Sequence, residues 1–165
     1  MFATSFTVIL FSRQHFGTLP DVYNEWEPDA EFVGLTKDFS FDCPGVDSGE
    51  TAVLMFQSLG VASQATVLQI NGVDVYGGIP ITNERGVKER YALDWSANVM
   101  LVESNHQLKA AGNILHVEST GQEFIIDNVV ITYKTHIGPS KPPFKPPFPT
   151  AIRKRKSPAK RSTRD

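Results

Sequence analysis

The sequence predicts an all-β protein built as an antiparallel β-sandwich, and three observations support this fold class. Short apolar runs separated by turn residues fill residues 66–133, as in small sandwich domains. Asn71-Gly72 lies between two of these runs and predicts a hairpin, because this pair tolerates the positive φ angles of a type I′ turn. No convincing helical pattern separates the runs.

Three strands are expected before residue 60. The apolar run Phe6–Phe11 forms the first. Apolar and polar residues alternate in Lys37–Asp42, which predicts a half-buried strand with its two phenylalanines inward. The third covers residues 51–57 and contains Val53-Leu54-Met55-Phe56. This run is apolar on both faces and is therefore typical of a central strand.

The later strands follow the same pattern. The Asn71-Gly72 hairpin connects residues 65–70 to residues 73–76, and a long polar excursion then extends to about residue 95. An excursion of this length on a compact domain is often a binding loop. Further strands are expected at residues 100–102, 113–118 and 124–133.

The chain divides into an acidic body and a basic tail. Residues 1–134 carry 7 Lys/Arg and 17 Asp/Glu, whereas residues 135–165 carry 9 Lys/Arg and one Asp. The tail begins with a nearly repeated Lys-Pro-Pro-Phe unit, and proline cannot donate to a sheet ladder and favours a polyproline II path. We therefore expect a folded domain at residues 1–134 and a disordered, Pro-rich, polybasic tail at residues 135–165.

Cys43 is the only cysteine, so no intrachain disulfide and no cysteine-rich metal site is possible. This favours a reducing compartment. The apolar run near the start is short and precedes the first basic residue, Arg13, whereas a secretory signal has the opposite order and a longer apolar region. We expect a cytoplasmic protein, or a nuclear one in a eukaryotic cell, with no membrane span.

The later part of the chain resembles a known family. The run from Val67 to Val75, then Trp95, Leu108 and the turn and strand at residues 112–118 are similar to the galactose-binding-domain-like jelly roll. This superfamily includes carbohydrate-binding modules and accessory domains of glycoside hydrolases. The resemblance covers residues 65–133 and implies a jelly-roll scaffold. Members of the family bind sugars, lipids, nucleic acids or proteins, so the scaffold alone does not identify a ligand.

Aromatic residues around the long loop are the candidate sugar ligands, because the apolar face of a pyranose packs on a flat ring while carboxylates accept hydrogen bonds from its hydroxyls. Trp95 could instead belong to the core. Tyr23 and Trp26 could line a groove or cover the edge of the sandwich, and the Asn71-Gly72 and Gly112-Asn113 turns are interpreted as structural. The candidate ligand-binding residues are Tyr76, Tyr91, Trp95 and Asp74.

A structural calcium ion is implied by the resemblance, since jelly-roll modules often carry one between the first and last strands. Asp127 or Asp47 could supply oxygen ligands, but no spaced acidic loop motif is present. Asp127 also lies within an apolar strand, where it would simply mark the exposed face. We therefore expect no cofactor, with a structural calcium ion as the alternative.

No catalytic motif is present: the sequence lacks a Gly-x-Ser-x-Gly elbow, a His-Glu-x-x-His pair and a phosphate loop. His116 alternates with Glu118 on the face opposite the apolar side chains of its strand, which predicts solvent exposure. Cys43 has no basic neighbour in sequence that would lower its pKa. A non-enzyme is therefore expected.

Two hypotheses for function remain open. The first is a carbohydrate-binding, lectin-like module whose site includes the loop at residues 76–95. The second is a structural, protein-interaction or assembly domain with the tail as a basic attachment arm. In either case the tail could contact a polyanion, or it could fold back on the acidic body. Its candidate polyanion-binding residues are Arg153, Lys154, Arg155, Lys156, Lys160 and Arg161.

Overall fold

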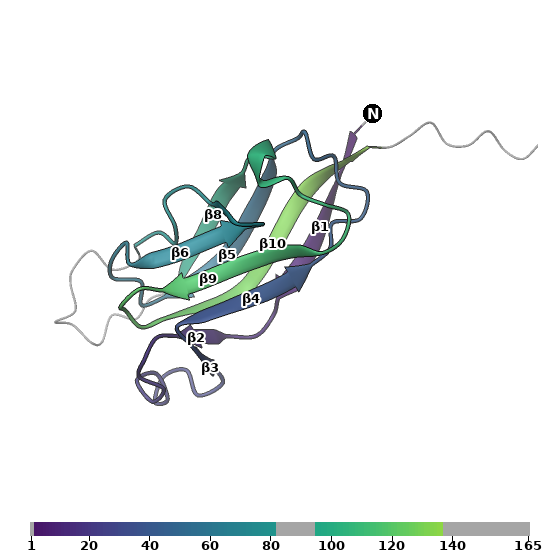
Figure 1. The fold of residues 1–165 in the computed structure, drawn as a ribbon. Helices are drawn as coiled ribbons and strands as arrows, with labels where there is room; N and C mark the ends of the chain where they lie inside the picture. The colour runs from purple at the N-terminus through teal and green to yellow at the C-terminus, as the bar shows by residue number, and fades with distance from the viewer. Residues whose placement is uncertain (1, 82–94, 137–165) are drawn as a thin grey trace, which may run out of the picture.

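The computed structural model describes residues 2–81 and 95–136 and confirms an all-β, two-sheet sandwich (Figure 1). Within these ranges the one helical element is a single 3-10 turn, η1 (Ser104–His106). None of the described residues forms a helix long and apolar enough to cross a membrane. The tail expected to be disordered begins within the last strand and otherwise lies outside the described residues.

The larger sheet, sheet A, has β10 (Phe124–His136) at its centre. One side of β10 pairs with β5 (Ala52–Leu59), which pairs in turn with β8 (Ser96–Val102). The other side of β10 pairs with β1 (Phe2–Leu10) and β2 (Gln14–Phe16). β2 and β3 (Glu31–Gly34) are parallel, so one pair departs from the wholly antiparallel arrangement that the sequence predicts.

The smaller sheet, sheet B, has the order β4-β9-β6-β7 and is antiparallel throughout. Its strands are β4 (Thr36–Phe41), β6 (Thr66–Ile70), β7 (Val73–Asp74) and β9 (Asn113–Ser119). Asn71 has φ 53° and Gly72 φ 80°, which confirms the predicted hairpin, because both central residues of a type I′ turn require positive φ.

The core lies between the two sheets and is built by alternation along the strands. Phe39 and Phe41 of β4 are buried, as their spacing predicts. β5 is central, and Leu54 and Phe56 point into the core from it. Because side chains alternate across a strand, every second residue of these strands is left on an outer face.

A β-bulge interrupts β10 at Asp127 and Asn128, where the pairing with β5 shifts register and Asn128 has φ 51°. The expectation that Asp127 marks an exposed face is wrong: the residue is only 7% exposed. Its Oδ2 atom lies 3.5 Å from Nε of Arg13, which covers it. β10 also continues to His136, two residues beyond the predicted domain end.

Candidate functional site

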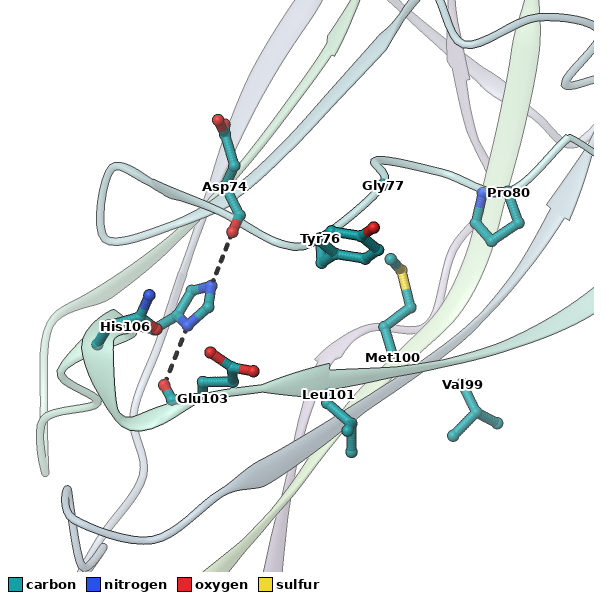
Figure 2. Close-up of a pocket in the computed structure, with 10 residues that line it drawn as sticks. Asp74, Tyr76, Gly77, Pro80, Val99, Met100, Leu101, Glu103 and His106 are labelled. Carbon is teal, nitrogen blue, oxygen red and sulfur yellow. Dashed lines mark hydrogen bonds between the residues drawn. The ribbon is translucent and has the colours of Figure 1, made fainter.

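An open hollow of about 640 Å³ lies beside β8. It lies between two edge strands, β8 of sheet A and β7 of sheet B. Figure 2 shows Tyr76, Pro80 and Met100 around this hollow, with Glu103 on its polar side; the carbonyl oxygen of Asp74 faces His106, and its carboxylate points the other way.

His106 connects the two sheets beneath the hollow. The residue is 3% exposed, and its ring nitrogens lie 3.0 Å from the carbonyl oxygen of Glu103 and 3.1 Å from that of Asp74 (Figure 2). Both neighbours are backbone carbonyl oxygens, which accept hydrogen bonds. The ring thus fixes the start of η1 against the end of β7.

Asn71 supports the same region from the hairpin. Its Nδ2 atom donates to the carbonyl oxygen of His106 at 3.0 Å and to Oδ1 of Asn113 at 3.1 Å. Asn113 is completely buried. The turn residues interpreted as structural therefore are structural, and they set the position of η1 and of the polar side of the hollow.

Tyr76 is the highly exposed aromatic side chain that lines the hollow. It lies two residues after the end of β7 and is 93% exposed, although large aromatic rings are normally buried to a high degree. Two glycines with positive φ, Gly77 and Gly78, follow it and turn the chain towards Pro80. The ring is therefore presented to solvent at the border of a concave surface.

Polar groups line the hollow on the side opposite Pro80. Asp74 is exposed, and one of its carboxylate oxygens accepts a hydrogen bond from Nε2 of Gln69 at 2.8 Å. Glu103 and Asn105 are also exposed. An aromatic plane next to several hydrogen-bonding side chains can hold a polar ligand that has an apolar face.

Trp95 does not line the hollow. It packs on an apolar cluster of Tyr23, Leu59 and Ile125 on the outer face of sheet A. Its Nε1 atom donates to Glu27 at 3.0 Å, and the Arg13 guanidinium lies 5.5 Å from the ring centroid. Trp95 precedes β8, whereas Glu103 follows it, so the strand separates Trp95 from the polar side of the hollow.

The structure therefore brings together Asp74 and Tyr76 of the predicted ligand residues and does not add Trp95 to them. Tyr91 and the six basic tail residues lie outside the described residues. Tyr23 covers the sandwich and does not line the hollow: it is 6% exposed and donates its hydroxyl to the carbonyl oxygen of Glu123 at 2.9 Å. Burial, and then the Glu123 carboxylate, raise the pKa of Tyr23 to about 12.

The two aspartates considered for calcium are occupied by other partners. Asp127 faces Arg13, and Oδ1 of Asp47 accepts a hydrogen bond from the Gly49 backbone at 3.0 Å. Across residues 2–81 and 95–136, no three His, Cys, Asp or Glu side chains come together in a way that could hold a metal ion.

Neither of the reactive side chains that the sequence draws attention to forms a catalytic arrangement. Nδ1 of His116 lies 2.6 Å from Oδ1 of Asp38 across the outer face of sheet B, and the hydrogen bond that the imidazole donates to this carboxylate raises the pKa of His116. Cys43 is completely buried. Burial, and then the neighbouring Asp42 carboxylate, raise the pKa of the Cys43 thiol to about 11, which removes its thiolate at neutral pH.

Several residues of the hollow could not be found by sequence reasoning. Met100, Glu103, Asn105 and His106 lie on or just after β8, and nothing in their local pattern marks a site. They become neighbours of Tyr76 only because the edges of the two sheets meet there. The sequence signals for this region are Tyr76 and Asp74 themselves and the hairpin that positions β7.

No protein-family model matches the sequence, and no curated protein matches it. Solved structures with a similar fold include the following two. The first is a β-porphyranase of glycoside hydrolase family 86 from the human gut bacterium Bacteroides plebeius, with a TM-score of 0.52 and 16% identity over 82% of this chain and 21% of that chain. The second is wild-type BuGH86 in complex with neoagarooctaose, with a TM-score of 0.50 and 13% identity over 81% of this chain and 19% of that chain.

The chain thus spans about one fifth of the length of these proteins. At this level of identity the likeness establishes a shared fold alone. This protein has a β-sandwich fold that also occurs as one part of glycoside hydrolase family 86 chains.

Proposed function

We propose that this protein is a non-catalytic carbohydrate-binding module and that the hollow beside Tyr76 is its sugar site. The observation that carries the proposal is the 93% exposure of Tyr76 at the border of a concave, partly polar surface. A pyranose ring can lie with its C–H face on the tyrosine while its hydroxyls bond to the polar side chains of Glu103 and Asn105.

Two further points support this proposal. The resemblance to galactose-binding-domain-like jelly rolls implies a scaffold on which sugar sites are common. The structural neighbours belong to a glycoside hydrolase family, and one was solved in complex with neoagarooctaose. Agar oligosaccharides are therefore the first ligands to test, within a panel of plant, bacterial and animal glycans.

The test is calorimetric titration of the full chain with neoagarooctaose, preceded by the glycan panel. We expect Tyr76→Ala to weaken binding at least tenfold, which corresponds to about 1.4 kcal/mol, and Tyr76→Phe to retain most of it. Phe11→Ala is the matched control, because Phe11 is another highly exposed ring, at 76%, outside the hollow. Absence of binding across the panel, or equal binding by Tyr76→Ala, would refute the proposal.

A further inference from the structure

The outer face of sheet A has an apolar area, here called the bare face. It consists of two rows that cross four strands in register. Each row takes one residue from each of β1, β10, β5 and β8, and none of the eight side chains is charged. The rows are Phe6, Thr132, Val53 and Leu101, and Val8, Val130, Met55 and Val99.

Several of these side chains are exposed to a degree that is unusual for large apolar residues. Phe6 is 66% exposed, Val99 70% and Leu101 62%. Val99 and Leu101 also belong to the lining of the hollow, but Figure 2 shows their side chains on the other side of β8 from Met100. The bare face and the proposed sugar site therefore adjoin each other along β8.

The other outer surfaces of the sandwich are polar or covered. Sheet B presents Asp38, His116, Gln69 and Asp74 along one row of its outer face. The end of sheet A beyond the β10 bulge is covered by the chain itself, because Tyr23, Ala30 and Trp95 pack over it. The bare face is the continuation of this covered surface, which indicates that it too is normally covered.

We propose that the bare face is covered by the Pro-rich segment at residues 139–149 of the same chain. This segment contains six prolines, two phenylalanines, two lysines and one serine, so it combines apolar surface with an extended backbone that loses little conformational freedom on docking. Residues 82–94, which also lie outside the described residues, carry six charged side chains among thirteen and suit an apolar face poorly.

The length of the chain fits this arrangement. β10 belongs to the bare face and ends at His136, four residues beyond Thr132, a distance of roughly 13 Å along a strand. Residues 137–141 can reach back over at most about 17 Å. Residues 142–148 in a polyproline II conformation then extend roughly 22 Å, close to the width of about 19 Å that four neighbouring strands occupy.

Size favours a segment of chain over a second protein molecule. A standard protein–protein interface takes about 800 Å² from each partner, whereas two rows across four strands cover only a few hundred Å². A segment tethered next to the face needs little intrinsic affinity, because a short tether gives an effective concentration on the order of 1 mM.

The lysines of the segment are also complementary in charge to carboxylates at the end of the bare face where β10 ends. Asp47 hydrogen-bonds its backbone N–H to the carbonyl oxygen of Lys134 at 2.8 Å, so it lies beside the end of β10. Glu50 precedes β5, and Glu103 follows β8 at the same end, since Ala52 pairs with Val102. Lys141 and Lys145 of the segment can approach these carboxylates while its phenylalanines lie on the apolar rows.

The test places a nitroxide label on the full chain at Thr150→Cys and records broadening of methyl NMR signals. The native thiol at Cys43 is buried and does not compete for the label. We expect the signals of Val99, Leu101 and Val130 to broaden at least twofold more than that of Ile114, which lies on sheet B. Phe144→Ser with Phe148→Ser should abolish this difference, whereas Arg153→Ser with Arg155→Ser should preserve it.

A mixture of labelled protein without isotope and isotope-enriched protein without label separates contacts within a chain from contacts between chains. Broadening that occurs when the label and the isotope are in the same chain, but not in the mixture, supports the proposal. Equal broadening in the mixed sample would overturn it in favour of a second copy on the bare face. Two other results would also overturn the proposal, in favour of diffuse charge attraction or of no docking. One is equal broadening of Ile114 and of the bare face. The other is a difference between them that persists after both phenylalanines are replaced.

Discussion

Asn71 and Asn113, which belong to two different turns, are hydrogen-bonded to each other through Nδ2 and Oδ1 at 3.1 Å. Asn71 also accepts from the Ile114 backbone at 3.1 Å and donates to the carbonyl oxygen of His106. Asn113 in turn accepts from the Lys109 N–H at 2.8 Å. This pair of amides joins the hairpin to the segment that follows β8 and thereby supports the hollow.

Replacement of Asn113 by alanine is expected to destabilise the protein by about 2–3 kcal/mol, because the N–H and the carbonyl oxygen of Lys109 lose their hydrogen-bond partner. The side chain is 0% exposed and also donates to the Lys109 carbonyl at 2.7 Å. Chemical denaturation of the wild type and Asn113→Ala measures the difference. Asn24→Ala removes an exposed amide and is the control, with an expected effect within about 0.5 kcal/mol. Equal effects of the two substitutions would contradict this role.

The strands and the hairpin could be predicted because their signals are local. Alternation in Lys37–Asp42 and the Asn71-Gly72 pair act within a few residues, and the structure confirms both. β2 and β3 are three and four residues long, too short for a period to be recognised. Their pairing depends on β10, more than ninety residues later in the chain.

The candidate site was only half predictable for a related reason. Tyr76 and Trp95 are both aromatic residues at the borders of one loop, so the sequence gives no ground for separating them. Their environments differ because Glu27 and Arg13, which are distant in sequence, surround Trp95, whereas Tyr76 remains exposed. Only the tertiary structure supplies these partners.

The His116–Asp38 contact predicts a pH dependence. The hydrogen bond that His116 donates to the Asp38 carboxylate raises the pKa of His116, so the folded state binds the proton more tightly than the unfolded state, in which the pKa is about 6.5. The contact therefore stabilises the protein fully below about pH 6.5 and is lost as the pH rises through the folded-state pKa. NMR titration of the ring measures that pKa.

The matched variant for this titration is Asp38→Asn, which keeps the shape of the side chain but removes its charge. We expect the pKa of His116 to fall towards its ordinary value. The effect on stability should be small, because the carboxylate is 63% exposed and water screens the pair. An unchanged pKa in Asp38→Asn would rule out this contact as the cause.

Cys43 is expected to be inert towards thiol reagents in the folded protein. Its side chain is completely buried and its pKa is raised to about 11, so at pH 8 the reactive thiolate is scarce. Reaction with a coloured disulfide reagent should be at least about a hundredfold slower than in denaturant, where the pKa returns to roughly 8.5. Ser48→Cys, at an exposed position, provides the fast-reacting control. Equal rates in native and denatured protein would show that the site opens readily.

The position of the domain end can be tested by truncation. Thr135 and His136 pair with Ala3 and Phe2, and Thr135 also forms a bridge with Val46. We expect a chain ending at His136 to melt within a few degrees of full length, and one ending at Lys134 to melt roughly 3–5 °C lower, as a loss of about 1 kcal/mol implies. Thermal unfolding followed by circular dichroism measures both. A fall of about 10 °C or more on removal of residues 137–165 would mean that the tail is a major part of the fold.

The basic end of the tail is expected to bind polyanions without reading their sequence. Residues 153–161 concentrate six positive charges within nine positions, outside the residues that the structure describes. Each phosphate neutralised by Lys or Arg releases counterions, so binding should weaken steeply with salt, by up to ~0.9 logarithmic units per tenfold rise in salt for each contact on duplex DNA. Titrations of full-length protein and of residues 1–136 with DNA, RNA and heparin at two salt concentrations measure this directly. If full-length protein binds none of them at low salt, or no better than the truncated chain, the tail is a solvated appendage and the polyanion role is wrong.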